Sequence, residues 1–212
     1  MLIVVAICGA RRVGKDTVAD YLCAQHGFSK ASFAAPLKDM VRAAFGFSQL
    51  QVDGALKDTI DPVHGITPRQ ALQFMGTEIM QYEIKRLMPD LSRTFWVDRL
   101  VRDWIVSCDA PSNRIVVSDM RFLHEHRNLA EAVQRAGGVY QAWCVTRLKT
   151  CPAEAGAEAK AEAGAEAGVD AHASEQDFKA ISADVQLIND FDLAGLYRDV
   201  ERALRRVLDE LA

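Results

Sequence analysis

An apolar run at the start of the chain leads directly into a loop bounded by glycines. Residues 2–7 read LIVVAI, and residues 9–15 read GARRVGK. The continuous apolar run predicts a strand buried on both faces, as in a parallel sheet. Residues 15–24 then place Val18, Ala19 and Leu22 on one face of a helix. A strand, a glycine loop and a helix in this order predict an α/β domain.

The loop has the GxxxxGK spacing of a phosphate-binding loop, in the strand-to-helix context that such a loop requires. Glycines allow the backbone to curl, so that successive N–H groups point inward at a phosphate. Lys15 then spans the β- and γ-phosphates as a point charge. An ordinary glycine turn is the alternative, and the spacing and flanking elements argue against it. We expect ATP to contact Gly9, Arg11, Arg12, Val13, Gly14 and Lys15.

The residues that follow the lysine depart from the usual pattern, in which a Ser or Thr gives its hydroxyl to Mg²⁺. Here Asp16 comes first and Thr17 second. A carboxylate is a hard oxygen ligand and can hold Mg²⁺ directly or through water. Thr17 can hydrogen-bond a phosphate, and Asp16 also suits a helix N-terminus as a structural cap. Which of the two serves the metal stays open.

Strand and helix signals alternate along the rest of the chain, which predicts right-handed crossovers and a parallel sheet flanked by helices. Thr67 and Pro68 form a good helix start, with Thr as cap and Pro in the first position. Helices are expected at residues 37–45, 67–87, 94–106, 125–136 and 193–211. Strands are expected at residues 115–117, 139–145 and 185–188.

The acidic excess of the chain lies in one segment. Residues 153–170 hold four Glu, one Asp and one Lys, so they account for the whole formal charge of −4. Without a net basic face, the chain does not fit a general nucleic-acid binder. Its five scattered cysteines predict a reducing compartment, without disulfides or a zinc knuckle. The apolar run at 2–7 is too short for a membrane span and lacks a basic leader, so we expect a cytoplasmic protein.

The same acidic segment is a duplication. Residues 153–160 read AEAGAEAK and residues 161–168 read AEAGAEAG. The segment has no large apolar residue and cannot pack into a core. It predicts a surface excursion, and a tolerated loop expansion is a simpler interpretation than a specific role.

Six sequence elements, in order along nearly the whole chain, resemble the bacteriophage deoxynucleoside monophosphate kinase family. They are GKDTVAD at 14–20, SFAAPLK at 32–38, PRQALQ at 68–73 with GTE at 76–78, SDMRF at 118–122, HASE at 172–175 and IND at 188–190. The resemblance implies a three-layer P-loop NTPase fold with a central parallel sheet in a single domain, residues 1–212. It also implies a helical acceptor-binding insertion at about 30–110 and a lid at about 147–180, which contains the repeat. A phage-encoded enzyme would act in the host cytoplasm.

Four arginine and acidic positions suit phosphoryl transfer between two nucleotides. Arg69, in the first turn of the helix that begins at Thr67, can bind an acceptor phosphate. Asp119 follows the strand at 115–117, at the edge where α/β proteins bind ligands, and can hold Mg²⁺ through water. Arg121 can reach the acceptor or the transferring phosphate, although a plain ion pair with Asp119 is the alternative. Arg147 resembles a lid arginine that excludes water on closure.

The remaining candidates contact substrate. Gln73, one turn after Arg69, can hydrogen-bond the acceptor base. Phe33 and Trp96 are the aromatic residues that we expect to stack on a base, although aromatics at helical spacing usually belong to a core. Asn189 stands where related kinases wrap the adenine of ATP, or in a simple turn. The resemblance further implies substrate contacts from Lys38 and Glu175.

We therefore expect an ATP- and Mg²⁺-dependent kinase that phosphorylates deoxynucleoside monophosphates. Rival hypotheses are a P-loop kinase for another acceptor, such as phosphomevalonate or a hydroxymethylated base in DNA, and a nucleotide-dependent ATPase or switch. The HASE element also resembles phosphomevalonate kinase. A long helical insertion and an arginine-bearing lid favour a kinase, because a switch needs no pocket for a second phosphate compound. The sequence leaves open the base, the sugar and whether the protein forms a homodimer.

Overall fold

Strand β1 (Ile3–Cys8) is the middle strand of a five-stranded sheet with the order β2-β3-β1-β4-β5. It pairs in parallel with β3 (Arg114–Val117) and β4 (Val139–Thr146). Strand β4 pairs in parallel with β5 (Val185–Ile188), and β2 (Ser29–Ala31) lies beyond β3. All six residues of β1 are buried, as its unbroken apolar run predicts. The carboxyl ends of β1, β3, β4 and β5 therefore meet at one edge of the sheet.

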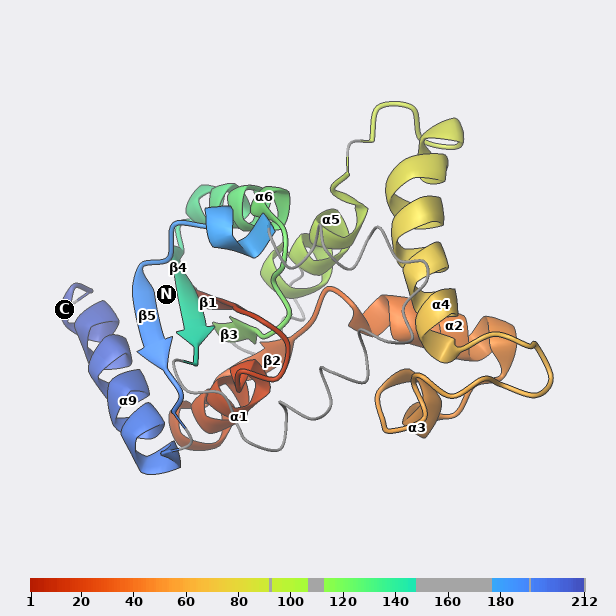
Figure 1. Cartoon of the computed structure of the whole chain (residues 1–212). Helices are drawn as coiled ribbons and strands as arrows, with labels where there is room; N and C mark the ends of the chain where they lie inside the picture. Colours follow the sequence, from red (N-terminus) through yellow and green to blue (C-terminus); the bar gives the residue numbers. More distant parts are fainter. Residues whose placement is uncertain (92, 107–112, 148–176, 191, 212) are drawn as a thin grey trace. The chain divides into compact units, whose positions relative to one another are not determined.

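Helices cover both faces of this sheet. In the computed structural model, α1 (Lys15–His26) and α9 (Leu193–Asp209) pack together on one face, and α6 (Leu123–Arg135) packs against β4 on the other (Figure 1). The alternate residues Ile3 and Ile7 of β1 belong to the core shared with α1 and α9, because successive side chains of a strand point to opposite faces. With the glycine loop between β1 and α1, this is the three-layer P-loop NTPase fold, and the fold prediction is confirmed.

The structure describes residues 1–91, 93–106, 113–147, 177–190 and 192–211. Two compact units divide the chain: Met1–Lys30 together with Asp109–Ala212 forms the sheet unit, and Ala31–Cys108 forms the helical unit. Over the described ranges, no helix combines the length and the apolar character that crossing a membrane requires. Nearly all of the predicted lid, including Glu175 and the repeat, lies outside these ranges. The insertion predicted at 30–110 corresponds in span to the helical unit, and its role in acceptor binding stays a prediction.

The helical unit is built on its own small core of Val41, Phe47, Val52, Ala71 and Leu72. Its elements are α2 (Ala35–Phe45), α3 (Gln49–Val52), α4 (Pro68–Gln73), the π-helix η1 (Phe74–Tyr82), the 3₁₀-helix η2 (Glu83–Arg86), α5 (Phe95–Val101) and the π-helix η3 (Arg102–Val106).

The two longest predicted helices of this unit change type along their length. The helix predicted at 67–87 begins as an α-helix at Pro68, becomes a π-helix at Phe74 and ends as a 3₁₀-helix. The helix predicted at 94–106 becomes a π-helix at Arg102. In a π-helix, hydrogen bonds join the backbone groups of residues i and i+5, which makes each turn wider than in an α-helix. Single π-turns occur frequently at functional sites. Apolar spacing does not distinguish an α- from a π-turn, so the sequence could not predict this.

Candidate active site

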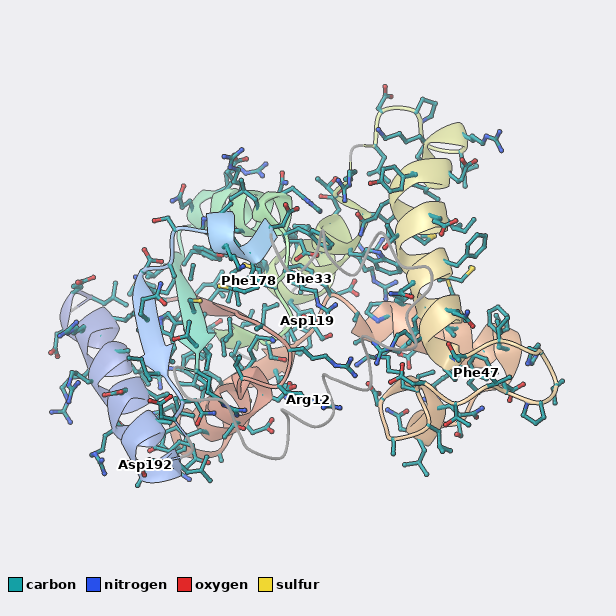
Figure 2. All side chains as sticks on the ribbon, in the orientation of Figure 1. Arg12, Phe33, Phe47, Asp119, Phe178 and Asp192 are labelled. Atoms are coloured by element: carbon teal, nitrogen blue, oxygen red, sulfur yellow. The ribbon has the colours of Figure 1, made fainter. Side chains whose placement is uncertain are left out.

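The glycine loop between β1 and α1 has a backbone that depends on its glycines. Gly9 has φ 138° and Gly14 has φ 103°. A Cβ at Gly9 would overlap the carbonyl oxygen of Val145, and one at Gly14 would overlap Nδ2 of Asn189. Arg12, with φ 62°, is the one non-glycine residue with a positive φ in the described ranges; Figure 2 marks its position on the loop. Positive φ at these three loop positions gives a curled backbone of the kind that can present N–H groups to an anion.

Lys15, the first residue of α1, folds its side chain back over this loop. Its Nζ donates to the carbonyl oxygens of Gly9 at 2.9 Å and Ala10 at 2.7 Å. Burial lowers the pKa of Lys15, and the positive charge of Arg121 lowers it further. The contacts hold the ammonium group above the loop, where a phosphate would lie. A phosphate contact by Lys15 stays a prediction.

Asn189, directly after β5, joins the glycine loop to the sheet through hydrogen bonds. Its side chain is 5% exposed, and its Nδ2 donates to the Val13 carbonyl oxygen at 2.8 Å. Its backbone N–H donates to Thr146 at 2.8 Å, and Nε of Arg147 donates to its carbonyl oxygen at 3.3 Å. The side-chain amide of Asn189 thus holds the phosphate loop at Val13. An adenine contact by Asn189 stays a prediction, as does the lid role of Arg147.

The carboxylate of Asp16 faces the end of β3. Its Oδ1 accepts hydrogen bonds from Nζ of Lys30 at 2.8 Å and from Oγ of Ser118 at 3.0 Å. Burial acts to raise the pKa of Asp16, but the hydrogen bond and charge of Lys30 and the Ser118 hydroxyl outweigh it, so the pKa is lowered. Lys30 also pairs with Asp20, one turn along α1, at 2.9 Å. Thr17, the other candidate for the metal, is partly buried.

Ser118 was not predicted as a site residue, because the neighbouring Asp119 offered a more obvious ligand. A signal was nevertheless present. Ser118 directly follows β3 as Gly9 directly follows β1, and these strands are neighbours in the sheet. Polar residues that follow neighbouring parallel strands meet at the same edge.

Asp119 and Arg121 lie on the turn between β3 and α6, and Figure 2 marks Asp119 there. A buried carboxylate holds this turn: Glu125 accepts from the backbone N–H groups of Arg121 at 2.7 Å and Phe122 at 3.0 Å. Arg121 is exposed, and both it and Asp119 act electrostatically on Lys15. Asp16, Asp119 and Arg121 therefore all lie near enough to Lys15 for their charges to act on it, and their roles with ATP and the acceptor stay predictions.

Glu125 makes the free energy of unfolding of the sheet unit depend on pH. Burial raises its pKa from about 4.5 to about 7. Between these values the folded state holds a proton that the unfolded state has lost, so the free energy of unfolding falls as pH rises. The shift corresponds to a loss on the order of 3 kcal/mol from pH 4.5 to above 7. Urea unfolding at pH 5 and pH 8 should show this loss in the parent protein and not in Glu125→Gln.

The exposed Glu131 of α6 is the matched control, because Glu131→Gln changes a carboxylate on the same helix that is not buried. Its pH dependence should follow that of the parent protein. An equal pH dependence for Glu125→Gln and the parent would contradict this assignment.

The oxygen atoms around Asp16 fit a bound Mg²⁺. Within the described part of the chain, no three His, Cys, Asp or Glu side chains are grouped closely enough to enclose a metal ion. Mg²⁺ does not need such a group, because it is usually held by one or two carboxylates together with substrate phosphates and water. Asp16 supplies one carboxylate beside the loop, and Asp119 supplies a second on the neighbouring turn.

In the helical unit, the predicted phosphate ligand Arg69 is paired with a carboxylate. Its guanidinium binds Asp58 through both Nε and Nη2, the latter at 3.0 Å, and the hydrogen bond to Asp58 raises its pKa. Its backbone N–H donates to Lys57 at 3.0 Å. Lys38 pairs with Asp53. Both cations therefore lie opposite carboxylates of the segment that joins α3 to α4.

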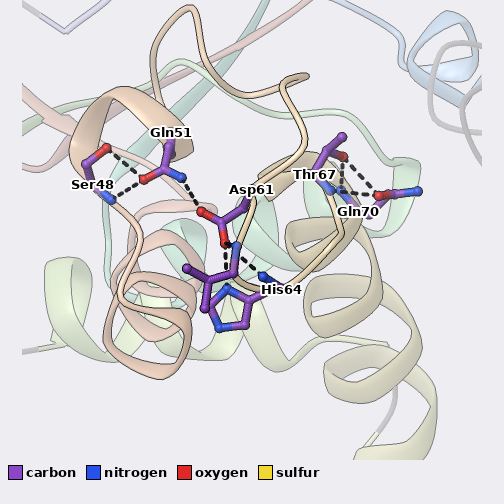
Figure 3. A network of polar contacts seen from close by, with 7 residues as sticks. Ser48, Gln51, Asp61, His64, Thr67 and Gln70 are labelled. Atoms are coloured by element: carbon purple, nitrogen blue, oxygen red, sulfur yellow. Dashed lines mark hydrogen bonds and ion pairs between the residues drawn. The ribbon is translucent and has the colours of Figure 1, made fainter.

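That segment is held by a polar network (Figure 3). Asp61 accepts from Nε2 of Gln51 at 3.1 Å and from the backbone N–H groups of Val63 at 3.1 Å and His64 at 3.0 Å. The His64 ring also contacts Asp61 at 2.8 Å. Where the segment ends, Thr67 caps α4, as the sequence predicts. The network fixes the backbone that carries Asp58.

The other predicted substrate contacts differ in exposure. Gln73 is exposed at the end of α4. Phe33 is 5% exposed and Trp96 is 9% exposed. The indole N–H of Trp96 donates to the Gly76 carbonyl oxygen at 3.0 Å, which joins α5 to η1. This contact gives Trp96 a structural role in the helical unit, and base stacking by Phe33 and Trp96 stays a prediction.

Comparison with known proteins identifies similar sequences. A model of the deoxynucleotide monophosphate kinase family matches residues 3–66, which include β1, the loop and α1. A protein of Acanthamoeba polyphaga mimivirus, described as "Putative deoxynucleotide monophosphate kinase", is 30% identical over 142 residues. The alignment covers 65% of this chain and 71% of the viral protein.

Three solved structures are remotely similar to this chain. TT1252 from Thermus thermophilus is 17% identical, with a TM-score of 0.48 and 100% of this chain and 98% of the other covered. A gluconokinase from Sinorhizobium meliloti is 12% identical, with a TM-score of 0.48 and coverage of 98% and 94%. Dephospho-CoA kinase from Campylobacter jejuni is 12% identical, with a TM-score of 0.46 and coverage of 96% of each chain.

Proposed function

The chain belongs to the deoxynucleotide monophosphate kinase family, and on this premise we propose that it transfers the γ-phosphate of ATP to deoxynucleoside monophosphates. The observation that carries the proposal is the loop itself: its glycine-dependent backbone, with the Lys15 ammonium held above it, suits the β- and γ-phosphates of a nucleotide. The products are ADP and a deoxynucleoside diphosphate.

The donor phosphates are held by α1 and its loop. Successive loop N–H groups and the N-terminus of α1 receive the β-phosphate, and Lys15 bridges it to the γ-phosphate. Mg²⁺, when bound, would neutralise charge on the phosphate oxygens, and Asp16 and Asp119 are the carboxylates that would hold it. Asn189 keeps the loop in place through Val13. These residues position the donor before transfer.

The acceptor phosphate needs its negative charge neutralised and its oxygen oriented, more than it needs a general base. A nucleotide phosphate is already largely ionised at neutral pH, so positioning and charge dominate catalysis. Arg121 binds the transferring phosphoryl group; the contact between its backbone N–H and Glu125, which holds this turn, supports that role. Arg69 binds the acceptor phosphate, in exchange for its contact with Asp58. Arg147 contacts the γ-phosphate as a lid arginine and helps to exclude water.

The role of Arg69 can be separated from a structural one by kinetics. Arg69→Ala should raise the KM of the acceptor by roughly 30- to 150-fold, because one charge-assisted bidentate contact is worth about 2–3 kcal/mol. The KM of ATP should change little. Arg42→Ala, which removes an exposed arginine paired with Asp39 in the same unit, is the matched control. Equal increases for both substrates would mean that Arg69 only holds Asp58.

A coupled ADP-release assay across the common nucleoside monophosphates and their deoxy forms tests the proposed function. We expect ADP release to depend on an acceptor and to be fastest with deoxynucleotides. A response to phosphomevalonate alone, or to DNA that contains hydroxymethylated bases, would assign a different acceptor. ADP release that is independent of any acceptor would indicate an ATPase or switch.

We also propose that the protein acts in a reducing compartment. The described cysteines Cys8, Cys23 and Cys144 are all free thiols, which supports a reducing compartment such as the cytoplasm.

A further inference from the structure

Two oxygen-bearing side chains are exchanged relative to the common phosphate-loop arrangement. In P-loop NTPases, a Ser or Thr after the loop lysine and an Asp at the end of a neighbouring strand hold Mg²⁺ together. Here the residue after the loop lysine, Asp16, carries a carboxylate, and the residue after β3, Ser118, carries a hydroxyl, with Thr17 and Asp119 one position further along. The two groups are in direct contact, with Oγ of Ser118 donating to Oδ1 of Asp16 at 3.0 Å.

The contacts of Asp16 separate this interpretation from a capping role. The cap residue of α1 is Gly14, and no side chain caps the helix there. The Asp16 carboxylate points instead toward β3 and β2, where it meets Ser118 and Lys30. Its side chain remains 76% exposed, so it is open to a further ligand. A capping carboxylate would bind backbone N–H groups of the first helical turn.

The position of Ser118 is fixed by the sheet. It follows Val117, which lies opposite Ala6 in the register of β3 with β1. Ser118 is 5% exposed, so its hydroxyl has little access to water and is satisfied by Asp16. A buried hydroxyl that donates to a carboxylate orients that carboxylate and leaves its remaining lone pairs for a cation.

Lys30 supplies a positive charge at the same place. Its Nζ lies 2.8 Å from Asp16 and 2.9 Å from Asp20, so the carboxylate of Asp16 is already bound by a cation of the chain. A divalent metal ion at Asp16 would compete with this ammonium group. Removal of Lys30 should therefore strengthen metal binding, whereas removal of Ser118 should weaken it.

We propose that Asp16 and Ser118 form an exchanged metal-binding pair, in which Asp16 is the ligand, Ser118 orients it and Lys30 is the counter-ion that the metal displaces. The inference rests on the proposed function, because the metal accompanies ATP at the loop. It adds Ser118 and Lys30 to the site as positioning residues.

The exchange can be reversed by mutation. Binding of Mn²⁺ is measured by electron paramagnetic resonance, with a non-hydrolysable ATP analogue present. Ser118→Ala should weaken Mn²⁺ binding by about 10-fold, and Asp16→Ser by about 10- to 100-fold, the range seen when metal ligands or their partners are removed. The double variant Asp16→Ser/Ser118→Asp restores the common arrangement and should bind Mn²⁺ within about 3-fold of the parent.

Two further variants sharpen the test. Lys30→Gln should tighten Mn²⁺ binding several-fold, because it removes a competing positive charge. Asp199→Asn is the matched control: it removes a carboxylate of α9 in the same unit, which pairs with Arg202. It should change the Mn²⁺ affinity by less than about 2-fold. Thermal unfolding and metal-free binding of the ATP analogue establish that each variant is folded.

The inference is overturned if the double variant, folded and able to bind the analogue, binds Mn²⁺ no better than Asp16→Ser. It is also overturned if Ser118→Ala leaves Mn²⁺ binding unchanged, since Ser118 would then not orient Asp16. Either result leaves the kinase proposal intact. Failure of the parent protein to bind any ATP analogue would instead overturn the proposed function.

Discussion

Replacement of Lys15 by methionine is expected to lower kcat by at least about 10³-fold, because it removes a positive charge from the transferring phosphoryl group. Methionine has a similar length and no charge, so the loop should keep its glycine-dependent backbone. Steady-state kinetics with ATP and a deoxynucleoside monophosphate would measure the loss, and circular dichroism would establish the fold.

Arg206→Met is the control for this change, because it removes an exposed positive charge on α9, in the same unit but outside the loop and the predicted lid. Its kcat should equal that of the parent. Near-normal turnover by a folded Lys15→Met protein would remove the basis for assigning phosphoryl transfer to this loop.

Arg121→Ala should have the second largest effect, a loss in kcat of about 10³-fold, the lower end of what a transition-state arginine contributes. The KM values should change far less, because the contact forms mainly in the transition state. Arg121→Lys should recover only part of the rate, since lysine lacks the planar fork of donors.

The matched control is Arg127→Ala, which removes an exposed arginine about one turn into α6. It should leave kcat unchanged. If Arg121→Ala retained the parent rate, Arg121 would serve only as a charge partner of its neighbours.

The fold was predictable because its signals are local. The apolar runs in β1 and at 115–117 in β3 are continuous, and β4 and β5 are mostly apolar with one glutamine each. Thr67 with Pro68 marks a helix start that the structure reproduces. The strand β2 and the helix α3 were not predicted, because three or four residues are too few to show a period. The change to π-turns at Phe74 leaves no trace in apolar spacing.

The residues of the site that are neighbours in the sequence were predictable. The contacts between residues far apart in the sequence were not. The GxxxxGK spacing identifies Lys15 and its glycines without a structure. The contact between Asn189 and Val13 joins residues 176 positions apart, and the one between Ser118 and Asp16 joins residues 102 apart. The sequence could place these residues at the same sheet edge but could not show which atoms meet. The pairing of Arg69 with Asp58 depends likewise on a segment held by Asp61.

The most direct measurement follows the γ-phosphate itself. The protein is incubated with Mg²⁺, ATP labelled with ³²P at the γ-position, and one deoxynucleoside monophosphate at a time, and the products are separated by chromatography. Our account predicts that the label moves into a deoxynucleoside diphosphate, and that little label is released as inorganic phosphate. Label that appears only as inorganic phosphate, at the same rate with and without an acceptor, would contradict it.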